Sequence, residues 1–177
     1  FDTKYQIMNS LLVTYILQTE KWTSPELFET KNRIYTFLNP VSYLIALENK
    51  SLFEQFDGIF ADGSLLVSAI RLVYGKRVTR RSFDMTSLAP ELLNYLMESR
   101  KTLYIVASGQ EQVECSVRIF QEQYPELRIA GFRNGYFSSD AEMNKEASHI
   151  VELNPDFLIV GMGALMQEKF LLKVKKM

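Results

Sequence analysis

The stretch FDGIFADGSL, residues 56–65, carries a carboxylate and a glycine directly after a short apolar run. The apolar run predicts a strand over residues 57–61, so Asp62 and Gly63 fall at its carboxyl end, where ligands bind in α/β sheets. A carboxylate there can serve as a general base, and a glycine beside it lets backbone approach a substrate closely. Asp-Gly is also a common turn pair, so a turn that only ends the strand is the alternative interpretation.

Three other predicted strands end in loops that carry polar residues or glycines. These loops contain Asn39, then Ser108 and Gly109, and finally the segment from Gly161 to Glu168. Because the carboxyl ends of parallel strands meet at one edge of a sheet, we expect all four loops to converge there. This convergence indicates a site more strongly than any single residue does.

Two glycines, Gly161 and Gly163, separate an apolar strand from a helical pattern. They indicate either close packing or close approach of a ligand. The complete GxGxxG fingerprint is absent, because Ala164, Leu165 and Met166 follow, so we expect no Rossmann dinucleotide site.

Charged and amide side chains near these loops have two interpretations each. Gln167 can bind a sugar or a base, and Glu168 can either bind substrate or cap the helix that it opens, where the helix dipole favours it. Arg80 and Arg81 offer planar guanidinium groups that suit phosphate, or they form a solvated ion-pair cluster with Asp84.

The segment Asn134-Gly135-Tyr136-Phe137 combines a turn pair with two aromatic residues. Asn-Gly predicts a tight turn, because both residues tolerate unusual backbone angles. From the residues alone, Tyr136 and Phe137 are expected to pack.

Composition excludes several classes of function. The 20 basic and 21 acidic residues give a net charge of −1, which argues against a nucleic-acid partner. The single cysteine, Cys115, rules out an internal disulfide and is expected to be a small buried apolar residue. The single histidine, His149, has no cysteine nearby, and the sequence has no Asp-x-Asp pair, so we expect no metal site. The apolar runs are shorter than the roughly 18–20 residues of a membrane span.

Apolar periodicity and turn residues divide the chain into helices and strands, with a break at 23–25. Strands are predicted at 33–39, 57–61, 102–108, 127–132 and 156–163, and helices at 4–20, 40–49, 64–74, 88–99, 110–124 and 139–152. This alternation predicts a Rossmann-like α/β fold with a mostly parallel sheet and helices on both faces. The continuous apolar run at 156–163 is typical of a strand buried on both faces. We expect the 177 residues to form a single domain.

An ordered series of short motifs spans residues 32 to 172. It comprises TFLN at 36–39, ADG at 61–63, FDMTSL at 83–88, IVASGQEQV at 105–113, YPELRIAGFRNGYF at 124–137 and NPDFLIVGMGALMQEKF at 154–170. In order and spacing, this series resembles the WecG/TagA/CpsF glycosyltransferase family, also called glycosyltransferase family 26.

The resemblance implies an inverting, metal-independent glycosyltransferase that needs no cofactor. The enzyme would move an N-acetylmannosamine-type or related sugar from a UDP donor to a polyprenyl-diphosphate-linked acceptor, in teichoic acid, capsule or exopolysaccharide synthesis. It implies a cytoplasmic protein, peripheral to the inner face of the cell membrane, that can form a homodimer. Family members continue into a C-terminal membrane-targeting segment, which we expect to lie outside residues 1–177.

By position in the motifs, the resemblance makes Asp62 the catalytic base. The candidate substrate-binding residues are Asn39, Gly63, Arg80, Arg81, Asp84, Ser108, Gly109, Gly135, Tyr136, Gly161, Gly163, Gln167 and Glu168. Only one of Arg80 and Arg81 matches the family's arginine. Leu165 and Met166 replace the family's usual Pro-Lys, which leaves open a catalytically silent sugar-nucleotide-binding or scaffold domain as the alternative.

Overall fold

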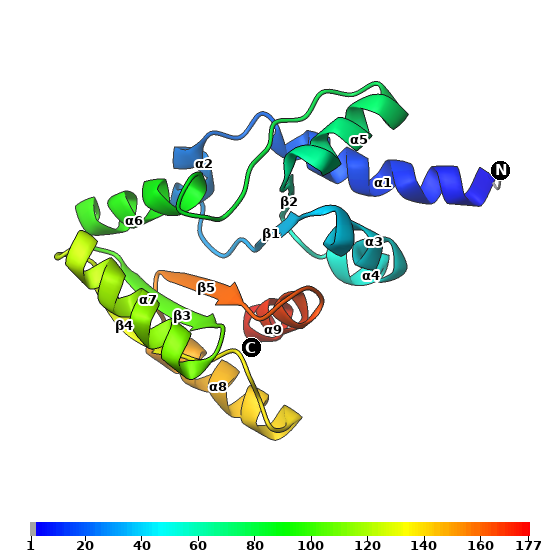
Figure 1. Cartoon of the computed structure of the whole chain (residues 1–177). Coiled ribbons are helices and arrows are strands. Elements are labelled where there is room, and N and C mark those ends of the chain that lie inside the picture. Colours follow the sequence, from blue (N-terminus) through cyan, green and yellow to red (C-terminus); the bar gives the residue numbers. More distant parts are fainter. Residues whose placement is uncertain (1–2) are drawn as a thin grey trace. The chain divides into compact units, whose positions relative to one another are not determined.

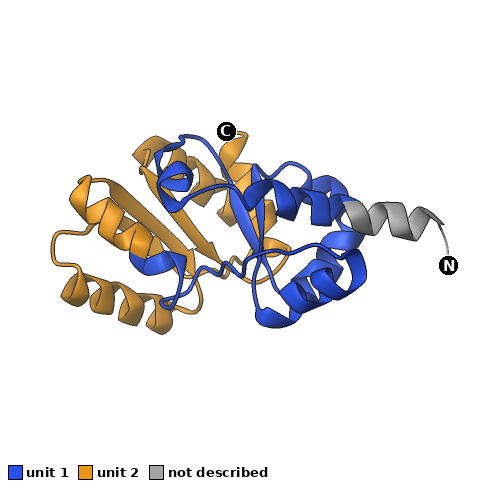
Figure 2. Cartoon of the chain, turned by 90° about the horizontal axis from the view of Figure 1, so that it is seen from above, with its two compact units in different colours: residues 1–90 blue, residues 91–177 orange. Residues whose placement is uncertain are grey.

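The computed structural model describes the backbone of residues 3–177 and the side chains from residue 11 onward. The chain divides into two compact units, which we call unit 1 (residues up to Pro90) and unit 2 (residues from Glu91), coloured separately in Figure 2. In the described part of the chain, no helix is both long enough and apolar enough to cross a membrane.

Unit 1 contains two parallel strands among helices (Figure 1). Its elements are α1 (Thr3–Thr19), α2 (Ser24–Glu29), β1 (Tyr35–Leu38), α3 (Pro40–Glu48), α4 (Lys50–Phe53), β2 (Gly58–Ala61) and α5 (Ser64–Tyr74). Strand β1 pairs with β2 from Tyr35 opposite Gly58 to Leu38 opposite Ala61. Each strand therefore delivers its following loop to the same end of this small sheet.

The core of unit 1 fixes the position of β2. All four residues of β2 are buried, and α1 lies against the strand with Leu12 and Ile16 fully buried. On the other strand, the ring of Phe37 stacks on that of Phe60 with centroids 5.1 Å apart. Gly58 allows close approach, because a Cβ there would lie 2.8 Å from the ring of Trp22. Close packing of this kind fixes the position of β2 within unit 1.

Local signals in unit 1 set the helix boundaries. Helix α5 ends at Gly75, which takes the left-handed conformation with φ +64°, as predicted. The predicted break at 23–25 is instead the start of α2, where the backbone N–H of Thr23 donates to the carboxylate of Glu26 at 2.7 Å. Pro25 stands in the first turn of α2, where it suits a helix start.

Unit 2 follows a regular alternation of strand and helix (Figure 1). Helix α6 (Leu88–Glu98) spans the division between units and is followed by β3 (Thr102–Ala107), α7 (Gln110–Gln123), β4 (Arg128–Arg133), α8 (Asp140–Leu153), β5 (Phe157–Gly161) and α9 (Met166–Lys175). The sheet has the order β4-β3-β5, and both pairings are parallel. The predicted α/β fold with parallel strands is thus confirmed, although the described strands fall into two sheets.

Three packing predictions in unit 2 are wrong. Tyr136 was expected to pack and is 75% exposed, whereas Phe137 packs against Phe170 as expected. The strand predicted at 156–163 was expected to be buried on both faces, yet β5 is an edge of the described sheet and is only half-buried. Cys115 was expected to be buried and is exposed. Helix α7 buries Val113 and Val117. Cys115 lies midway between them in the sequence, so its side chain points to the opposite side of the helix.

Candidate functional site

The first group of candidate residues follows β1 and β2 in unit 1. The backbone N–H of Asp62 donates to the carbonyl of Leu38 at 2.8 Å, which extends the strand pairing by one residue. Gly63 then takes φ +88° and ψ 136° immediately before α5. A Cβ added to Gly63 would meet nothing within 4 Å, so the glycine is needed for its backbone angles and not for space.

Asp62 is an accessible carboxylate beside a cation. Its side chain is 32% exposed, and its Oδ1 lies 3.9 Å from Nε of Arg80. Burial raises the pKa of Asp62 above its usual value, while Arg80 opposes that rise. A carboxylate with a raised pKa is better suited to accept a proton than an ordinary surface aspartate is.

Asp84 organises the loop that brings Arg80 to Asp62. Its carboxylate accepts from Ser82 Oγ at 2.7 Å, and from the N–H and Oγ1 of Thr86 at 2.8 and 2.7 Å. Arg80 Nη2 donates to the same carboxylate at 3.1 Å. Hydrogen bonds from Thr86 and Ser82 lower the pKa of Asp84 to about 2, so this side chain stays ionised and holds the loop.

Arg81 differs from Arg80 in its surroundings. Its backbone N–H donates to the carbonyl of Ala61 at 2.9 Å, and its guanidinium lies 5.6 Å from the ring centre of Phe60. Its Nη1 is buried and finds no hydrogen-bond partner among the described residues. A buried guanidinium nitrogen of this kind normally has an acceptor. The structure therefore separates the two arginines that the sequence left equivalent.

Asn39 is a helix cap. Its Oδ1 accepts from the backbone N–H groups of Val41 and Ser42 at 3.0 and 2.9 Å, and Pro40 occupies the first position of α3. Asparagine is strongly preferred at such a position, so the cap alone explains this residue type.

The second group of candidate residues surrounds a cavity of about 730 Å³ in unit 2. The cavity is lined by Ser108, Gly135, Tyr136, Phe137, Ser138, Ser139, Asp140, Met143, Gly161, Met162, Gly163 and Met166. It therefore collects five predicted site residues from the end of β5 and from the loops that follow β3, β4 and β5. Gly109, Gln167 and Glu168 do not line it. A smaller cavity of about 360 Å³ includes Met97 and Pro125 and holds none of the predicted residues.

Backbone hydrogen bonds join the three loops of this cavity. Ser108 donates its N–H to the carbonyl of Gly161 at 3.0 Å and accepts from the N–H of Gly135 at 2.8 Å. A Cβ on Gly135 would lie 2.9 Å from Cγ of Met162, and one on Gly161 would lie 3.2 Å from Cβ of Ala107. Gly135 and Gly161 thus permit close approach of the strand ends, which for Gly161 is the packing interpretation drawn from the sequence, whereas a Cβ on Gly163 would meet nothing within 4 Å.

Glu168 caps α9 from a fully buried position. Its Oε2 accepts the backbone N–H of Leu165 at 2.7 Å, and its Oε1 accepts the side-chain amide of Gln167 at 3.0 Å. Leu165 itself has φ +73°, an uncommon conformation for a leucine. This is the capping role that the sequence offered as the alternative to substrate binding.

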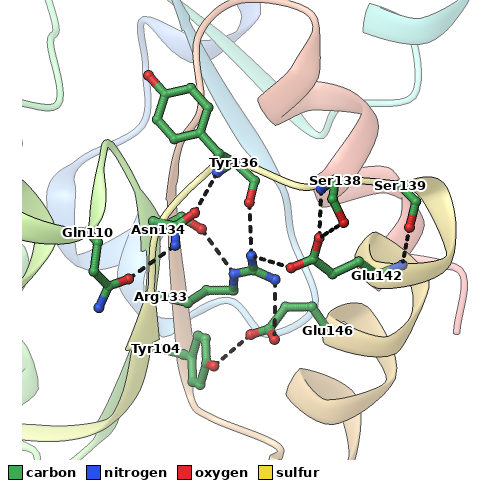
Figure 3. Close-up of polar contacts among 9 residues, drawn as sticks. All are labelled: Tyr104, Gln110, Arg133, Asn134, Tyr136, Ser138, Ser139, Glu142 and Glu146. Atoms are coloured by element: carbon green, nitrogen blue, oxygen red, sulfur yellow. Dashed lines mark hydrogen bonds and ion pairs between the residues drawn. The ribbon is translucent and has the colours of Figure 1, made fainter.

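A network around Arg133, at the end of β4, was not predicted from the sequence (Figure 3). This side chain is 17% exposed and contacts both the loop after β4 and two glutamates of α8, Glu142 and Glu146. The signal was present in the sequence, because Glu142 and Glu146 stand four residues apart and so share one helix face.

Metal-ligating side chains do not gather in the described part of the chain. No group of three or more histidine, cysteine, aspartate or glutamate residues is arranged there to hold a metal ion. His149 lies on α8 with its ring 6.1 Å from that of Tyr104, an edge-to-face contact.

Comparison with known proteins identifies relatives along most of the chain. The model of the glycosyl transferase WecG/TagA/CpsF family matches residues 15–177. A UDP-Gal:alpha-D-GlcNAc-diphosphoundecaprenol beta-1,4-galactosyltransferase of Shigella boydii is 31% identical over 142 residues, which cover 80% of this chain and 59% of the relative. An N-acetylglucosaminyldiphosphoundecaprenol N-acetyl-beta-D-mannosaminyltransferase of Bacillus subtilis (strain 168) is 24% identical over 168 residues, 93% of this chain and 62% of the relative.

The chain therefore spans about three fifths of the length of these curated relatives. The family match covers nearly the whole chain and agrees with the order of motifs in the sequence. The protein belongs to the WecG/TagA/CpsF family of glycosyltransferases.

Proposed function

We propose that this chain belongs to an inverting, metal-independent glycosyltransferase. It transfers an N-acetylmannosamine-type or related sugar from a UDP donor to a polyprenyl-diphosphate-linked acceptor. Family membership supports the transfer reaction, and both relatives are named for transfer to a sugar linked to diphosphoundecaprenol. The observation that carries the proposal is Asp62, an accessible carboxylate with a raised pKa that follows β2 beside Gly63.

Asp62 acts as the general base in this mechanism. Its carboxylate accepts the proton of the acceptor hydroxyl as that oxygen attacks the anomeric carbon of the donor. The bond from this carbon to the diphosphate oxygen breaks, and its electron pair leaves with UDP. A single displacement of this kind inverts the anomeric centre. General-base assistance contributes about 10²–10⁴-fold to the rate.

Arg81 is the arginine that meets the leaving diphosphate. Its buried Nη1 lacks a hydrogen-bond partner among the described residues, whereas Arg80 is engaged by Asp62 and Asp84. A guanidinium suits phosphate oxygens because it presents parallel N–H donors. Charge that develops on the UDP oxygen is stabilised by such donors and by backbone N–H groups at helix N-termini.

The unit 2 cavity takes the nucleotide part of the donor. Among its lining glycines, Gly163 leaves its backbone open to a ligand, since a Cβ there would meet nothing within 4 Å, and Tyr136 is 75% exposed at the lining. An exposed aromatic ring offers a stacking surface for a base. Ser108, Gly135, Gly161 and Gly163 line the same cavity. The proposed substrate-binding set is completed by residues that do not line it: Asn39, Gly63, Asp84, Gly109, Gln167 and Glu168.

The remaining proposals concern the setting of the reaction. We infer that the chain acts as one glycosyltransferase domain at the inner membrane face, where a segment outside these residues contacts the lipid, and that it can dimerise. The products feed capsule, exopolysaccharide or teichoic acid synthesis. Among the described strands, Asn39 and Asp62 follow the sheet of β1 and β2, whereas Gly109 and Gly163 follow the sheet of β3, β4 and β5, so the predicted single sheet edge for these four residues is not formed by the described strands.

A catalytically silent sugar-nucleotide-binding domain is the second candidate. It is favoured by the intramolecular hydrogen bonds that engage Asn39, Asp84 and Glu168. Binding of UDP without sugar transfer or donor hydrolysis by the full-length protein separates this candidate from the enzyme.

The deciding experiment compares Asp62→Asn with Asp57→Asn in the full-length protein. Asp57 precedes β2, and its carboxylate accepts the N–H of Ile34 at 2.8 Å, a bond that an asparagine oxygen can keep. We expect Asp62→Asn to lower kcat about 10²–10⁴-fold while UDP affinity stays within about threefold, and Asp57→Asn to keep both. Wild-type transfer by Asp62→Asn contradicts the proposal.

A further inference from the structure

The loop of residues 134–138, which we call the 134–138 loop, is held mainly through Arg133, and the amide of Asn134 also donates to Oε1 of Gln110 at 3.0 Å. Arg133 donates from Nε to the carbonyl of Asn134 at 3.0 Å and from Nη2 to the carbonyl of Tyr136 at 2.9 Å (Figure 3). The guanidinium thus binds two carbonyls of the turn that follows its own strand. Two donors in a rigid plane fix the positions of both carbonyls relative to β4.

The opposite side of the guanidinium is held by α8. Arg133 Nη2 donates to Glu142 Oε1 at 3.1 Å, and Nη1 lies 3.7 Å from Glu146 Oε2. Glu146 in turn accepts from the hydroxyl of Tyr104, on the central strand, at 2.6 Å. The guanidinium carbon also lies 4.0 Å from the ring centre of Phe137. Arg133 stands on β4, is paired with two glutamates of α8 and is linked to β3 through Glu146. These contacts fix its position independently of the loop.

Glu142 extends the same network to the far end of the loop. Its Oε2 accepts from the N–H and hydroxyl of Ser138 at 2.6 and 2.7 Å. Hydrogen bonds from Ser138 and Arg133 lower the pKa of Glu142 to about 2, so it remains ionised. The loop is consequently tied down at both ends by a single ion-paired group.

The consequence of these contacts is the placement of Tyr136. Its N–H donates to Oδ1 of Asn134 at 2.9 Å and its carbonyl accepts from Arg133, so the backbone polar groups point into the network. The side chain points away from the network, as Figure 3 shows, and Tyr136, which lines the cavity, is 75% exposed.

We propose that Arg133 is a positioning residue for donor binding: it fixes the 134–138 loop so that Tyr136 is presented to the nucleotide before the donor arrives. This inference rests on the proposed function of the unit 2 cavity as the nucleotide site. A loop already held in its binding shape loses less conformational entropy when the ligand binds, which increases affinity.

The test uses the full-length protein with Arg133→Gln, Arg133→Lys, Tyr136→Ala and the double variant Arg133→Gln/Tyr136→Ala. Arg128→Gln is the matched control, because Arg128 is an exposed arginine at the start of the same strand. The first readout is amide hydrogen exchange at Gly135, Tyr136 and Ser138 without ligand. The second is the Kd for UDP, measured by calorimetry.

We expect Arg133→Gln to speed exchange at these three amides and to raise the Kd for UDP, each by about tenfold, the scale of one lost charge-assisted hydrogen bond. Arg133→Lys keeps the charge but cannot reach both carbonyls with a planar fork, so it should match Arg133→Gln. In the Tyr136→Ala background, the Arg133→Gln change should alter the Kd by less than about twofold, because Arg133 acts through Tyr136.

Unchanged exchange in Arg133→Gln, or full rescue by Arg133→Lys, overturns the proposal. The proposal is also overturned if Arg133→Gln lowers UDP affinity equally in the wild type and in the Tyr136→Ala variant. That result means that Arg133 contacts the ligand directly or supports the whole unit. If Tyr136→Ala leaves the Kd unchanged, the nucleotide role of Tyr136 in the proposed function fails, while the exchange rates still decide whether Arg133 fixes the loop.

Discussion

Replacing Gly63 with alanine tests whether the backbone after β2 positions Asp62. Gly63 has φ +88° and ψ 136°, angles that strain any other residue, yet a Cβ there would meet nothing within 4 Å. The penalty of Gly63→Ala is therefore backbone strain alone, about 1–3 kcal/mol. Gly75 is a matched control, because it has φ +64° with equally open space and a penalty of about 1–2 kcal/mol.

The two variants are expected to lose similar stability and to differ in activity. Urea unfolding of unit 1 can be followed through Trp22, the only tryptophan of the chain. At a temperature where both variants are folded, Gly63→Ala should transfer sugar at least about tenfold more slowly, because small displacements of a reacting group are costly. Gly75→Ala should stay within about twofold of the wild-type rate, since it ends α5 away from Asp62 in sequence.

Two results contradict this reasoning. Wild-type transfer by Gly63→Ala, together with the expected loss of stability, means that the backbone at residue 63 does not position the base. An equal loss of rate in Gly75→Ala means that reduced stability alone explains the effect.

Two further predictions follow from the same geometry. Burial raises the pKa of Asp62, and the Arg80 guanidinium lowers it. The variant Arg80→Gln should therefore shift the acidic limb of the kcat/KM profile to higher pH. An acidic limb that does not move argues against Asp62 as the base. Glu168→Ala leaves the Leu165 N–H without its carboxylate acceptor and should cost about 1–3 kcal/mol in urea unfolding followed by circular dichroism. Exposed Glu122→Ala should cost less than about 0.5 kcal/mol; equal losses contradict the capping role.

The order and type of the long elements could be predicted from the sequence. Residues with fixed backbone preferences mark their limits: Pro40 starts α3, and Gly75 ends α5. Helices α2 and α4 escaped prediction because six and four residues are too few to show a helical period.

Burial was harder to predict, because it depends on neighbours distant in sequence. The apolar run of β5 predicted two covered faces, but no periodicity says which strand lies at an edge of the sheet. Cys115 shows the same limit, since residue type favoured burial while its place on α7 made it exposed.

The candidate site also contains residues that could be predicted from the sequence and residues that could not. Strand ends located Asp62, Gly63 and the glycines of the unit 2 cavity, because a chain position after a strand already fixes the edge at which a residue lies. The separate surroundings of Arg80 and Arg81 could not be predicted, since adjacent residues of one type differ only through tertiary contacts. The partners of Arg133 lie on another element for the same reason.

The strand order β4-β3-β5 has a consequence for how unit 2 forms during synthesis. Residues 102–133 contain everything needed to pair β3 with β4, whereas the other side of β3 pairs with residues 157–161. On a growing chain, that side of β3 therefore presents unpaired N–H and C=O groups until β5 has emerged. Open strand edges of this kind recruit other chains, so β3 is exposed to misassembly in the interval between synthesis of β4 and synthesis of β5.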